Sequence, residues 1–441
     1  MSTVAEVRLW GRTIGAVALE DGAEVASFEY APAFVRSGIE VAPLTMPLAS
    51  RIYTFPALAR ETFHGLPGLL ADSLPDRFGN VLIDAWLATQ GRSPASFTAI
   101  ERLCYTGSRG MGALEYAPAL GPQARQATRI QIEKLVELAS EILTHRHDLQ
   151  ASFGKDGKAA ALRDILRVGT SAGGARAKAV IAWNPITNEV RSGQIKAAPG
   201  FEPWLLKFDG VAGNKDKELE DPLGYGAIEY AYYRMATDAG ITMNECRLLE
   251  EGNRRHFMTR RFDRLADGEK LHMQSLGAMA HFDYNLAGAY AYEQAMHVIR
   301  QLGLPMRAVE EQFRRMVFNI VARNQDDHVK NIAFLMDKAG QWSLAPAFDV
   351  TYSFQLGGKW TSTHQMTLNG KRDDFTLEDF RACAAAASMP RGRAEAIIKE
   401  VCSVVSRWSD YAIKAGVSAD RREKIARTLR LDLSGNTQAP L

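Results

Sequence analysis

A chain of 441 residues is longer than one ordinary domain, so two or three domains or one elaborated two-lobed fold are expected. Charged residues make up 24% and hydrophobic residues 46%, which excludes a disordered or membrane-embedded chain. The net charge of +2 is too small to argue for wholesale nucleic-acid binding.

The cysteines and the N-terminus give no sign of an oxidising compartment or of a membrane. Cys104, Cys246, Cys383 and Cys402 lack CxxC or zinc-finger spacing, so neither a disulfide framework nor a zinc site is expected. The first residues contain no apolar signal core, and no apolar run reaches about 18 residues. We therefore expect buried thiols in a soluble cytoplasmic protein without a membrane partner.

Local patterns divide the chain into three parts. Residues 4–30 alternate short apolar runs with Gly-containing breaks, which predicts a meander of short antiparallel strands. Prolines punctuate a mixture of loops and helices over residues 43–75, and residues 129–145 have helical apolar spacing. The predicted parts are an N-terminal subdomain at 1–125, a part with a Gly-rich loop at 150–265, and a helical part at 266–435.

The block from Asp164 to Ala182 reads as two extended segments joined by small residues. Glycine lets a backbone approach phosphate oxygens closely, so this loop is a candidate phosphate cradle. Its candidate contacts are Gly173, Gly174, Ala175, Arg176, Ala177 and Lys178. Because the loop is neither a Walker A sequence nor a strict GxGxxG, a glycine-rich hairpin without a ligand is an equal alternative.

Two charged residues follow this loop in suggestive positions. Lys207 lies in the apolar strand Trp204 to Phe208, where it either reaches solvent or contacts nucleotide phosphates. Glu229 opens a helical stretch that ends near Gly240. This acid is expected to hold Lys207 in place, and the alternative is an exposed helix glutamate.

The remaining pattern is mostly helical. Residues 257–264 read as a strand, and residues 290–323 as helices interrupted at 303–305. Helices are expected again from about 377 to 429, with a frayed tail from 434 to 441.

Between these helical regions, residues 324–352 contain the strongest chemical signal. Asp326 and Asn331 are five residues apart, and Asp349 follows after a predicted hairpin. Kinases present a catalytic base and two magnesium ligands in this order. Asp326 is thus a candidate base, and Asn331 and Asp349 are hard oxygen ligands suited to Mg²⁺. With the upstream loop and lysine, the pattern predicts ATP-dependent phosphoryl transfer.

Several residues near these motifs have plainer interpretations. Asp327 is expected to be a solvated neighbour of Asp326, and His328 and Lys330 to satisfy loop backbone groups. His145 and His147 fit a basic helix end better than a metal site. A hydrolase triad has little support, since no nucleophile-elbow pattern accompanies His256, His272 and His281.

The motifs RGMGALEYAP, TSAGGARAK, WLLKFDG, RRFDR, NQDDHVKN and LAPAFDVTYS, in this order, resemble those of HipA-type serine/threonine kinase toxins over nearly the whole chain. The resemblance implies an α+β, two-lobed protein-kinase-like fold with an N-terminal β-rich subdomain and a largely α-helical C-terminal lobe. It makes Asp326 the catalytic base and Asn331 and Asp349 the metal ligands. It adds as nucleotide contacts Arg260, Arg261, Phe262, His328, Lys330, Asn331, Phe348 and Asp349. Two residues depart from the family pattern, Arg176 where glutamine is common and Arg260 where an acid is common.

The same resemblance implies a function and its regulation. The chain would phosphorylate a translation-related protein, such as an aminoacyl-tRNA synthetase, and arrest growth. Its partner would be a HipB-like helix-turn-helix antitoxin, through which it meets operator DNA. Ser171 occupies the position of the family's autophosphorylated serine, and phosphate there would repel nucleotide phosphates. The alternatives are a small-molecule kinase of the aminoglycoside or choline type, and a non-catalytic co-repressor.

Overall fold

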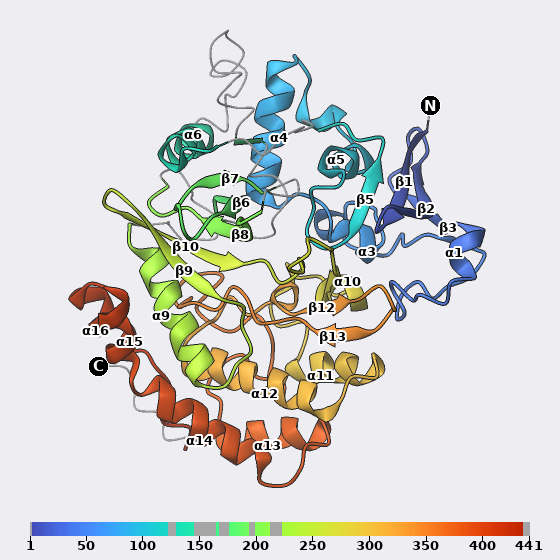
Figure 1. Ribbon diagram of the computed structural model, residues 1–441. Coiled ribbons are helices and arrows are strands. Elements are labelled where there is room, and N and C mark those ends of the chain that lie inside the picture. The colour runs from blue at the N-terminus through green and yellow to red at the C-terminus, as the bar shows by residue number, and fades with distance from the viewer. Residues whose placement is uncertain are drawn as a thin grey trace. The chain divides into compact units, whose positions relative to one another are not determined.

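The computed structural model describes residues 2–121, 129–144, 165–166, 176–193, 199–211 and 223–434. The chain forms two compact units (Figure 1). The first contains Met1–Gly226, Glu245–Gln274 and Leu335–Gln341, and the second contains Ala227–Asn244, Ser275–Phe334 and Trp342–Leu441. Short strands β11 (His272–Ser275) and β12 (Ala333–Met336) each include a point where the chain passes from one unit to the other.

The first unit begins with an antiparallel sheet of order β4-β3-β2-β1-β5. Its strands are β1 (Thr3–Leu9), β2 (Arg12–Leu19), β3 (Ser27–Tyr30), β4 (Ile52–Tyr53) and β5 (Leu114–Ala117). A two-residue turn with positive φ at Trp10 and Gly11 joins β1 to β2, as the right-handed twist of a tight hairpin favours. The meander predicted for residues 4–30 is confirmed.

Short helices accompany this sheet, and two longer ones form part of a shared core. The helices are α1 (Pro32–Val35), α2 (Arg60–Phe63), α3 (Gly68–Ala71), α4 (Arg77–Thr89), the 3₁₀ turn η1 (Pro94–Ser96), α5 (Ala99–Thr106) and α6 (Ile132–Thr144). The helix predicted at 129–145 is confirmed as α6. Its buried face joins the apolar face of α4 in one core cluster.

That core cluster also contains residues of the second sheet, whose order is β7-β6-β8-β10-β9. Its strands are β6 (Lys178–Trp183), β7 (Val190–Ser192), β8 (Glu202–Lys207), β9 (Cys246–Glu251) and β10 (Arg254–Arg260). Every residue of β6 is buried, so this strand has no polar face to turn toward water. Lys178, at the start of β6, is therefore placed by a fully packed strand.

A buried ion cluster fixes the segment after β10. Asp263 accepts two hydrogen bonds from Arg261, at 2.9 and 2.7 Å, one from Arg264 at 2.7 Å, and one from the Gly112 N–H at 2.7 Å. Burial alone would raise the pKa of Asp263, but the two guanidinium groups hold it well below its usual range. Because Gly112 precedes β5, the cluster ties the N-terminal sheet region to the end of β10.

The second unit is largely helical. Its elements are α9 (Tyr225–Asp238, of which the first two residues belong to the first unit), α10 (Leu276–Ala280), α11 (Tyr292–Gln301), α12 (Met306–Val321), the 3₁₀ turn η2 (Val329–Asn331), β13 (Trp342–Leu344), α13 (Leu377–Ala386), α14 (Arg393–Val405), α15 (Trp408–Ala415) and α16 (Ala419–Ala426). Figure 1 shows α12 beside both α11 and α14. The break predicted between helices at 303–305 is confirmed.

Tyr232 of α9 anchors the C-terminal end of α12. Its ring lies 6.1 Å from that of Phe318 and 5.3 Å from that of Trp408, measured between ring centroids. Its hydroxyl donates to the carbonyl of Ala322 at 2.6 Å, one residue beyond α12. The chain therefore leaves α12 from a fixed point, immediately before the segment with the kinase-like motif.

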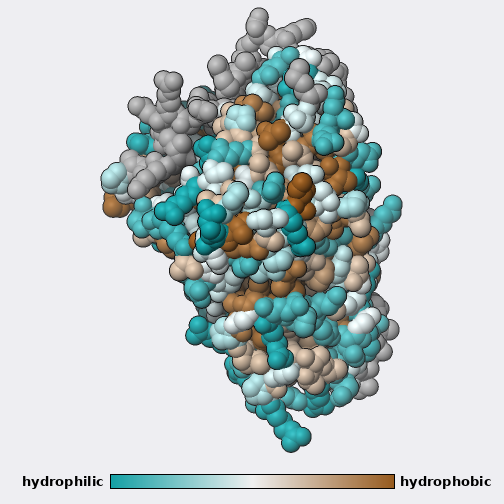
Figure 2. Space-filling model, turned by 90° about the vertical axis from the view of Figure 1, so that its right-hand side faces the viewer, coloured by the Kyte–Doolittle hydropathy of each residue, from teal (hydrophilic) through white to brown (hydrophobic). Residues whose placement is uncertain are grey.

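The thiols and the face shown in Figure 2 have no special feature. Cys104, Cys246 and Cys383 are buried and Cys402 is half-buried, all as free thiols. Polar and apolar side chains are interspersed on the face shown in Figure 2. Within the ranges that the structure describes, no helix is both long and apolar enough to span a bilayer.

The Asp263 cluster yields a stability prediction. Asp263→Asn removes the only negative charge of the triad that it forms with Arg261 and Arg264, leaving two buried guanidinium groups without it. We expect the free energy of unfolding to fall by about 3 kcal/mol, measured by urea unfolding at pH 7. Glu423→Gln, which breaks an exposed pair with Arg427, is the matched control and should leave the urea midpoint unchanged.

The same cluster predicts a pH dependence. A carboxyl with a depressed pKa in the folded state contributes stability above its ordinary pKa of about 4, and this contribution is lost as pH falls below that value. The difference in urea midpoint between wild type and Asp263→Asn should therefore shrink on acidification below pH ~4. A difference that stays constant down to pH ~2 would contradict the assignment.

Candidate active site

The segment after α12 lies beside the segment that contains Asp349, although the two are separated in sequence. A parallel bridge joins Asn324 to Ser353. The Gln325 N–H donates to the Ser353 carbonyl at 3.1 Å, and the Ser353 N–H donates to the Arg323 carbonyl at 3.0 Å. These bonds bring the Asp326 loop and the Asp349 loop together within the second unit.

Asp326 is held in place while its carboxylate stays accessible. Its Oδ1 accepts a hydrogen bond from the Trp360 indole N–H at 2.6 Å, and its side chain is 31% exposed. The Asn331 amide donates to the backbone carbonyl of Asp326 at 2.9 Å. One carboxylate oxygen is thus engaged, and the residue is oriented from both its side chain and its backbone.

Asp327 has the opposite environment, and its interpretation as a solvated neighbour is wrong. Its side chain is 1% exposed. It accepts hydrogen bonds from the Tyr292 hydroxyl and, at 2.7 Å, from the Gln365 N–H, and His364 Nδ1 lies 2.7 Å away. Burial alone would raise the pKa of Asp327, but His364 and these hydrogen bonds keep it below its ordinary value. Asp327 therefore anchors the loop.

A small cavity of about 30 Å³ lies against Asn331 and Asp349. Its lining also includes Asn324, Asp327 and Phe348, together with the cationic Arg315 and the ring of His328. The Asn331 nitrogen is already bonded to Asp326, which leaves the amide oxygen as the atom able to bind a cation. Mg²⁺ takes one or two carboxylates and completes its shell with water and phosphate oxygens. The donors of this cavity fit that requirement.

Asp349 has a special backbone conformation, with φ at +53°. Aspartate tolerates this left-handed region better than most residues, because its short polar side chain bonds locally. No group of three or more His, Cys, Asp or Glu side chains that fits a metal ion occurs in the described ranges. A site built from Asn331 and Asp349 therefore depends on ligands that arrive with the cation.

Three further predicted contacts of the second unit lie close to this loop. The His328 ring is 5.9 Å from the Tyr284 ring, and Lys330 Nζ lies 4.9 Å from the centre of that same ring. Phe348 precedes Asp349 and lines the small cavity. The structure thus gathers Asp326, His328, Lys330, Asn331, Phe348 and Asp349 in one region of the second unit.

The first unit contains the predicted phosphate-binding lysines. Lys178 at the start of β6 and Lys207 at the end of β8 are directly opposite each other in the antiparallel pair. Lys178 is 2% and Lys207 8% exposed. Lys178 Nζ lies 3.4 Å from the Asp76 carboxylate, and Lys207 Nζ lies 5.7 Å from the centre of the Phe257 ring.

The loop before Lys178 is described only in part. Arg176 stacks on Tyr225 with its guanidinium carbon 3.6 Å from the ring centre. Ala177 is buried, and its carbonyl accepts from the Phe208 N–H at 3.0 Å. Ser171, Gly173, Gly174 and Ala175 lie outside the described residues, so their predicted roles stay predictions.

The predicted hinge residues follow β10. The N–H groups of Arg260 and Arg261 donate to the carbonyls of Glu245 and Pro203, at 2.8 and 2.9 Å. Because these two N–H groups already donate to carbonyls of the protein, an adenine ring would have to hydrogen-bond to other backbone groups here. Phe262 is half-buried, and Arg261 is held by Asp263.

Glu229 is buried in α9 of the second unit, at 2% exposure, so it is not the exposed helix residue of the alternative interpretation. Its pairing with Lys207, which belongs to the first unit, stays a prediction. Lys178, a lysine predicted to bind phosphate, pairs instead with the carboxylate of Asp76.

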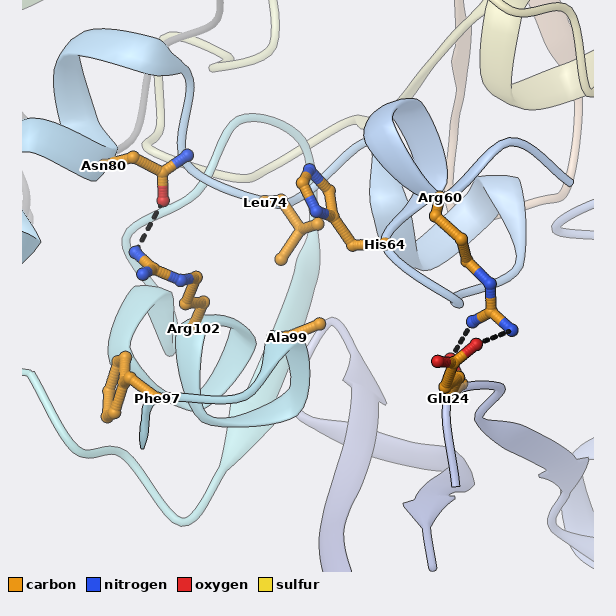
Figure 3. A pocket seen from close by; sticks show the side chains of 8 residues that line it. All are labelled: Glu24, Arg60, His64, Leu74, Asn80, Phe97, Ala99 and Arg102. Carbon is orange, nitrogen blue, oxygen red and sulfur yellow. Dashed lines mark hydrogen bonds and ion pairs between the residues drawn. The ribbon is translucent and has the colours of Figure 1, made fainter. Parts of the chain in front are cut away.

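A larger pocket, of about 510 Å³, lies in the N-terminal part of the first unit. Figure 3 shows Asn80 and Arg102 bonded on one side of it and Glu24 and Arg60 paired on the other. His64, Leu74, Phe97 and Ala99 complete the lining. None of these residues belongs to the kinase-like motifs.

The models of two protein-family domains match the chain. The HipA N-terminal domain matches residues 5–117, and the HipA-like C-terminal domain matches residues 170–408, more than half of the chain. The chain belongs to the HipA family. The family resemblance inferred from the motifs is confirmed.

Similarity to solved structures shows the fold of this HipA-family chain. HipA in the Shewanella oneidensis toxin–antitoxin complex of HipA, HipB and operator DNA matches with a TM-score of 0.65 and 16% identity, over 96% of this chain and 94% of that one. The Helicobacter pylori proinflammatory kinase CtkA matches with a TM-score of 0.35 and 13% identity, over 58% of this chain and 94% of that one. The match to the Shewanella oneidensis HipA confirms the predicted fold class.

Among curated proteins, a Haemophilus influenzae protein named "Putative kinase" is 30% identical over 187 residues. The alignment covers 37% of this chain and 54% of that protein. The HipA-family chain therefore spans about half the length of this relative.

Four partners of the predicted motif residues could not be identified from the sequence. Trp360 orients Asp326, Tyr292 and His364 contact Asp327, and Asp76 pairs with Lys178. Tyr292, His364 and Trp360 are 34 to 37 residues from their aspartate partners, and nothing in the local spacing links them. The contact of an aromatic or histidine side chain with a distant acidic motif can be identified only from the folded structure.

The neighbouring acids should respond differently to substitution. Asp327→Ala leaves Tyr292 and His364 without their buried acceptor, so we expect the free energy of unfolding to fall by about 3 kcal/mol. Asp326→Ala removes a partly exposed group and should cost less than about 1 kcal/mol. Urea unfolding of both variants at pH 7 measures the difference. Equal losses would contradict the anchoring role of Asp327.

Proposed function

We propose that this HipA-family chain is a Mg²⁺- and ATP-dependent serine/threonine protein kinase that acts as the toxin of a toxin–antitoxin pair. The observation that carries the proposal is the arrangement of Asp326, Asn331 and Asp349 in one region of the second unit. The first is oriented but accessible, and the other two line a cation-sized cavity. Phosphoryl transfer needs this combination of a positioned base and oxygen ligands.

Asp326 is the proposed general base. Trp360 holds one oxygen of its carboxylate and the Asn331 amide holds its backbone carbonyl, which leaves the second carboxylate oxygen to accept a proton. It accepts the proton of a serine or threonine hydroxyl as that oxygen bonds to the γ-phosphorus, while the bond from this phosphorus to the β–γ bridging oxygen breaks and ADP leaves. The Asp326 side chain is 31% exposed, so the substrate hydroxyl must approach it from its exposed side.

The remaining residues hold nucleotide and cation. Mg²⁺, when bound, neutralises charge on the β- and γ-phosphates. The oxygens of Asn331 and Asp349 would hold it at the small cavity. Lys178 and Lys207, together with the backbone of Gly173, Gly174, Ala175, Arg176 and Ala177, would hold the phosphates. Arg260, Arg261, Phe262, His328, Lys330 and Phe348 complete the proposed nucleotide contacts.

The proposed biology follows from the family. The Shewanella oneidensis protein was solved with HipB and operator DNA. We infer a HipB-like helix-turn-helix antitoxin as partner, with operator DNA bound through it. The substrate would be a translation-related protein in the cytoplasm, such as an aminoacyl-tRNA synthetase, whose modification arrests growth. The proposed division into an N-terminal subdomain at 1–125, a nucleotide-binding part at 150–265 and a helical lobe at 266–435 accompanies this function.

The role of Asp326 is tested by Asp326→Asn. The amide keeps the size of the side chain but cannot take a proton, so transfer of labelled phosphate from ATP to protein should fall by about 100-fold or more. Asp337→Asn, in the exposed turn after β12, is the control and should keep full activity. Undiminished phosphorylation by Asp326→Asn would show that another group is the base.

Self-inactivation is tested by Ser171→Ala. Phosphate on Ser171 would add almost two negative charges to a loop meant to hold phosphates, so the modified kinase should be inactive. We expect Ser171→Ala to stop self-phosphorylation and to keep phosphorylation of the target, measured by mass spectrometry and label transfer. The neighbouring Thr170→Ala is the control. Phosphate found only at other positions in wild type would reject Ser171.

A further inference from the structure

A buried ion pair joins the N-terminal HipA domain to the proposed nucleotide site. Asp76 and Lys178 lie 3.4 Å apart, with side chains 3% and 2% exposed. Asp76 belongs to the N-terminal family domain at 5–117, and Lys178 belongs to the C-terminal one at 170–408. A buried charge pair costs desolvation energy, so removing one partner leaves an expensive uncompensated charge.

Asp76 is held rigidly at the start of α4. One of its carboxylate oxygens accepts from the Gly79 N–H at 2.6 Å, which caps the helix. Asn80 in the first turn donates to the Pro75 carbonyl at 2.9 Å and accepts from Arg102 at 2.7 Å (Figure 3). The other Asp76 oxygen faces Lys178. The carboxylate therefore has one structural oxygen and one that faces the lysine.

Lys178 needs a neighbouring acid because Lys207 lies opposite it in the sheet. Lys178 and Lys207 are directly opposite on adjacent antiparallel strands, so their side chains leave the sheet on the same face. Like charges placed in this way repel each other, and both lysines are almost fully buried. A fixed carboxylate beside Lys178 offsets this repulsion and determines where its ammonium group points.

We propose that Asp76 is a positioning residue that holds Lys178 for the nucleotide phosphates, so that the N-terminal domain sets the affinity for nucleotide. This inference rests on the proposed nucleotide site. Protein kinases orient their phosphate-binding lysine with an acid from a neighbouring helix. Here the acid is the N-cap residue of α4, and it lies outside the C-terminal family domain.

Two substitutions separate the two roles of Asp76. Asparagine caps helices as well as aspartate but carries no charge, so Asp76→Asn keeps α4 intact and loses the ion pair. Glutamate keeps the charge but is not a favoured N-cap residue. Asp76→Glu therefore weakens the cap of α4 and retains a carboxylate for Lys178. If Asp76 positions Lys178, affinity for nucleotide follows the charge at position 76 and not the capping of α4.

The experiment is calorimetric titration of the full-length protein with ADP in Mg²⁺, together with urea unfolding. We expect Asp76→Asn to raise the dissociation constant about tenfold, as loss of one hydrogen bond to a charged group would. Asp76→Glu should keep most of the wild-type affinity, because it keeps the carboxylate. Thr98→Ala, which removes the capping box of α5, is the matched control and should lower stability without changing affinity.

The outcomes distinguish this inference from the proposed function. If wild type binds Mg²⁺–ADP and Asp76→Asn binds it equally well or more tightly, the positioning role is overturned and the nucleotide site stands. If Asp76→Glu loses as much affinity as Asp76→Asn, charge is not what matters and the inference also falls. If wild type binds no Mg²⁺–ADP, the nucleotide site and this inference fall together.

Discussion

The candidate site depends on the burial of Asp327. A carboxylate without access to water must be satisfied by hydrogen bonds, and Tyr292, His364 and the Gln365 N–H supply them from α11 and from the segment after Tyr352. These contacts fix the loop between α12 and η2. Asp326, one residue earlier, is thereby turned toward the accessible side, where Trp360 orients it. The adjacent acids thus divide two tasks, since one holds the backbone and the other is available for chemistry.

In the first unit, buried carboxylates likewise stabilise cationic side chains. Asp263 compensates Arg261 and Arg264 after β10, and Asp76 compensates Lys178 at the start of β6. In both cases a group from the N-terminal family domain contributes, the Gly112 N–H to Asp263 and the Asp76 carboxylate to Lys178. The N-terminal family domain therefore contributes to the charge balance of the proposed nucleotide-binding part. This gives a physical reason for the two domains to occur in one chain.

Elements and motif order were predictable from the sequence, but the partners of buried charges were not. The periodicity of residues 4–30, 129–145 and 290–323 reports local backbone geometry, which the structure confirms in β1 to β3, α6, α11 and α12. Asp326, Asn331 and Asp349 were found because their spacing is itself the signal. Asp327 was misread because Asp326 and Asp327 look alike in sequence. What distinguishes them is contact with residues 35 to 38 positions away. The pairing of Asp76 with Lys178 is of the same kind.

The central claim is that the arranged oxygens of the second unit transfer phosphate from ATP to a protein hydroxyl. The most direct measurement is incubation of the purified protein with γ-labelled ATP, Mg²⁺ and host lysate, followed by identification of labelled proteins. The account predicts label on serine or threonine of a distinct host protein, dependent on Mg²⁺ and absent with Asp326→Asn. Label on a small alcohol with no labelled protein, or no transfer at all, would contradict it.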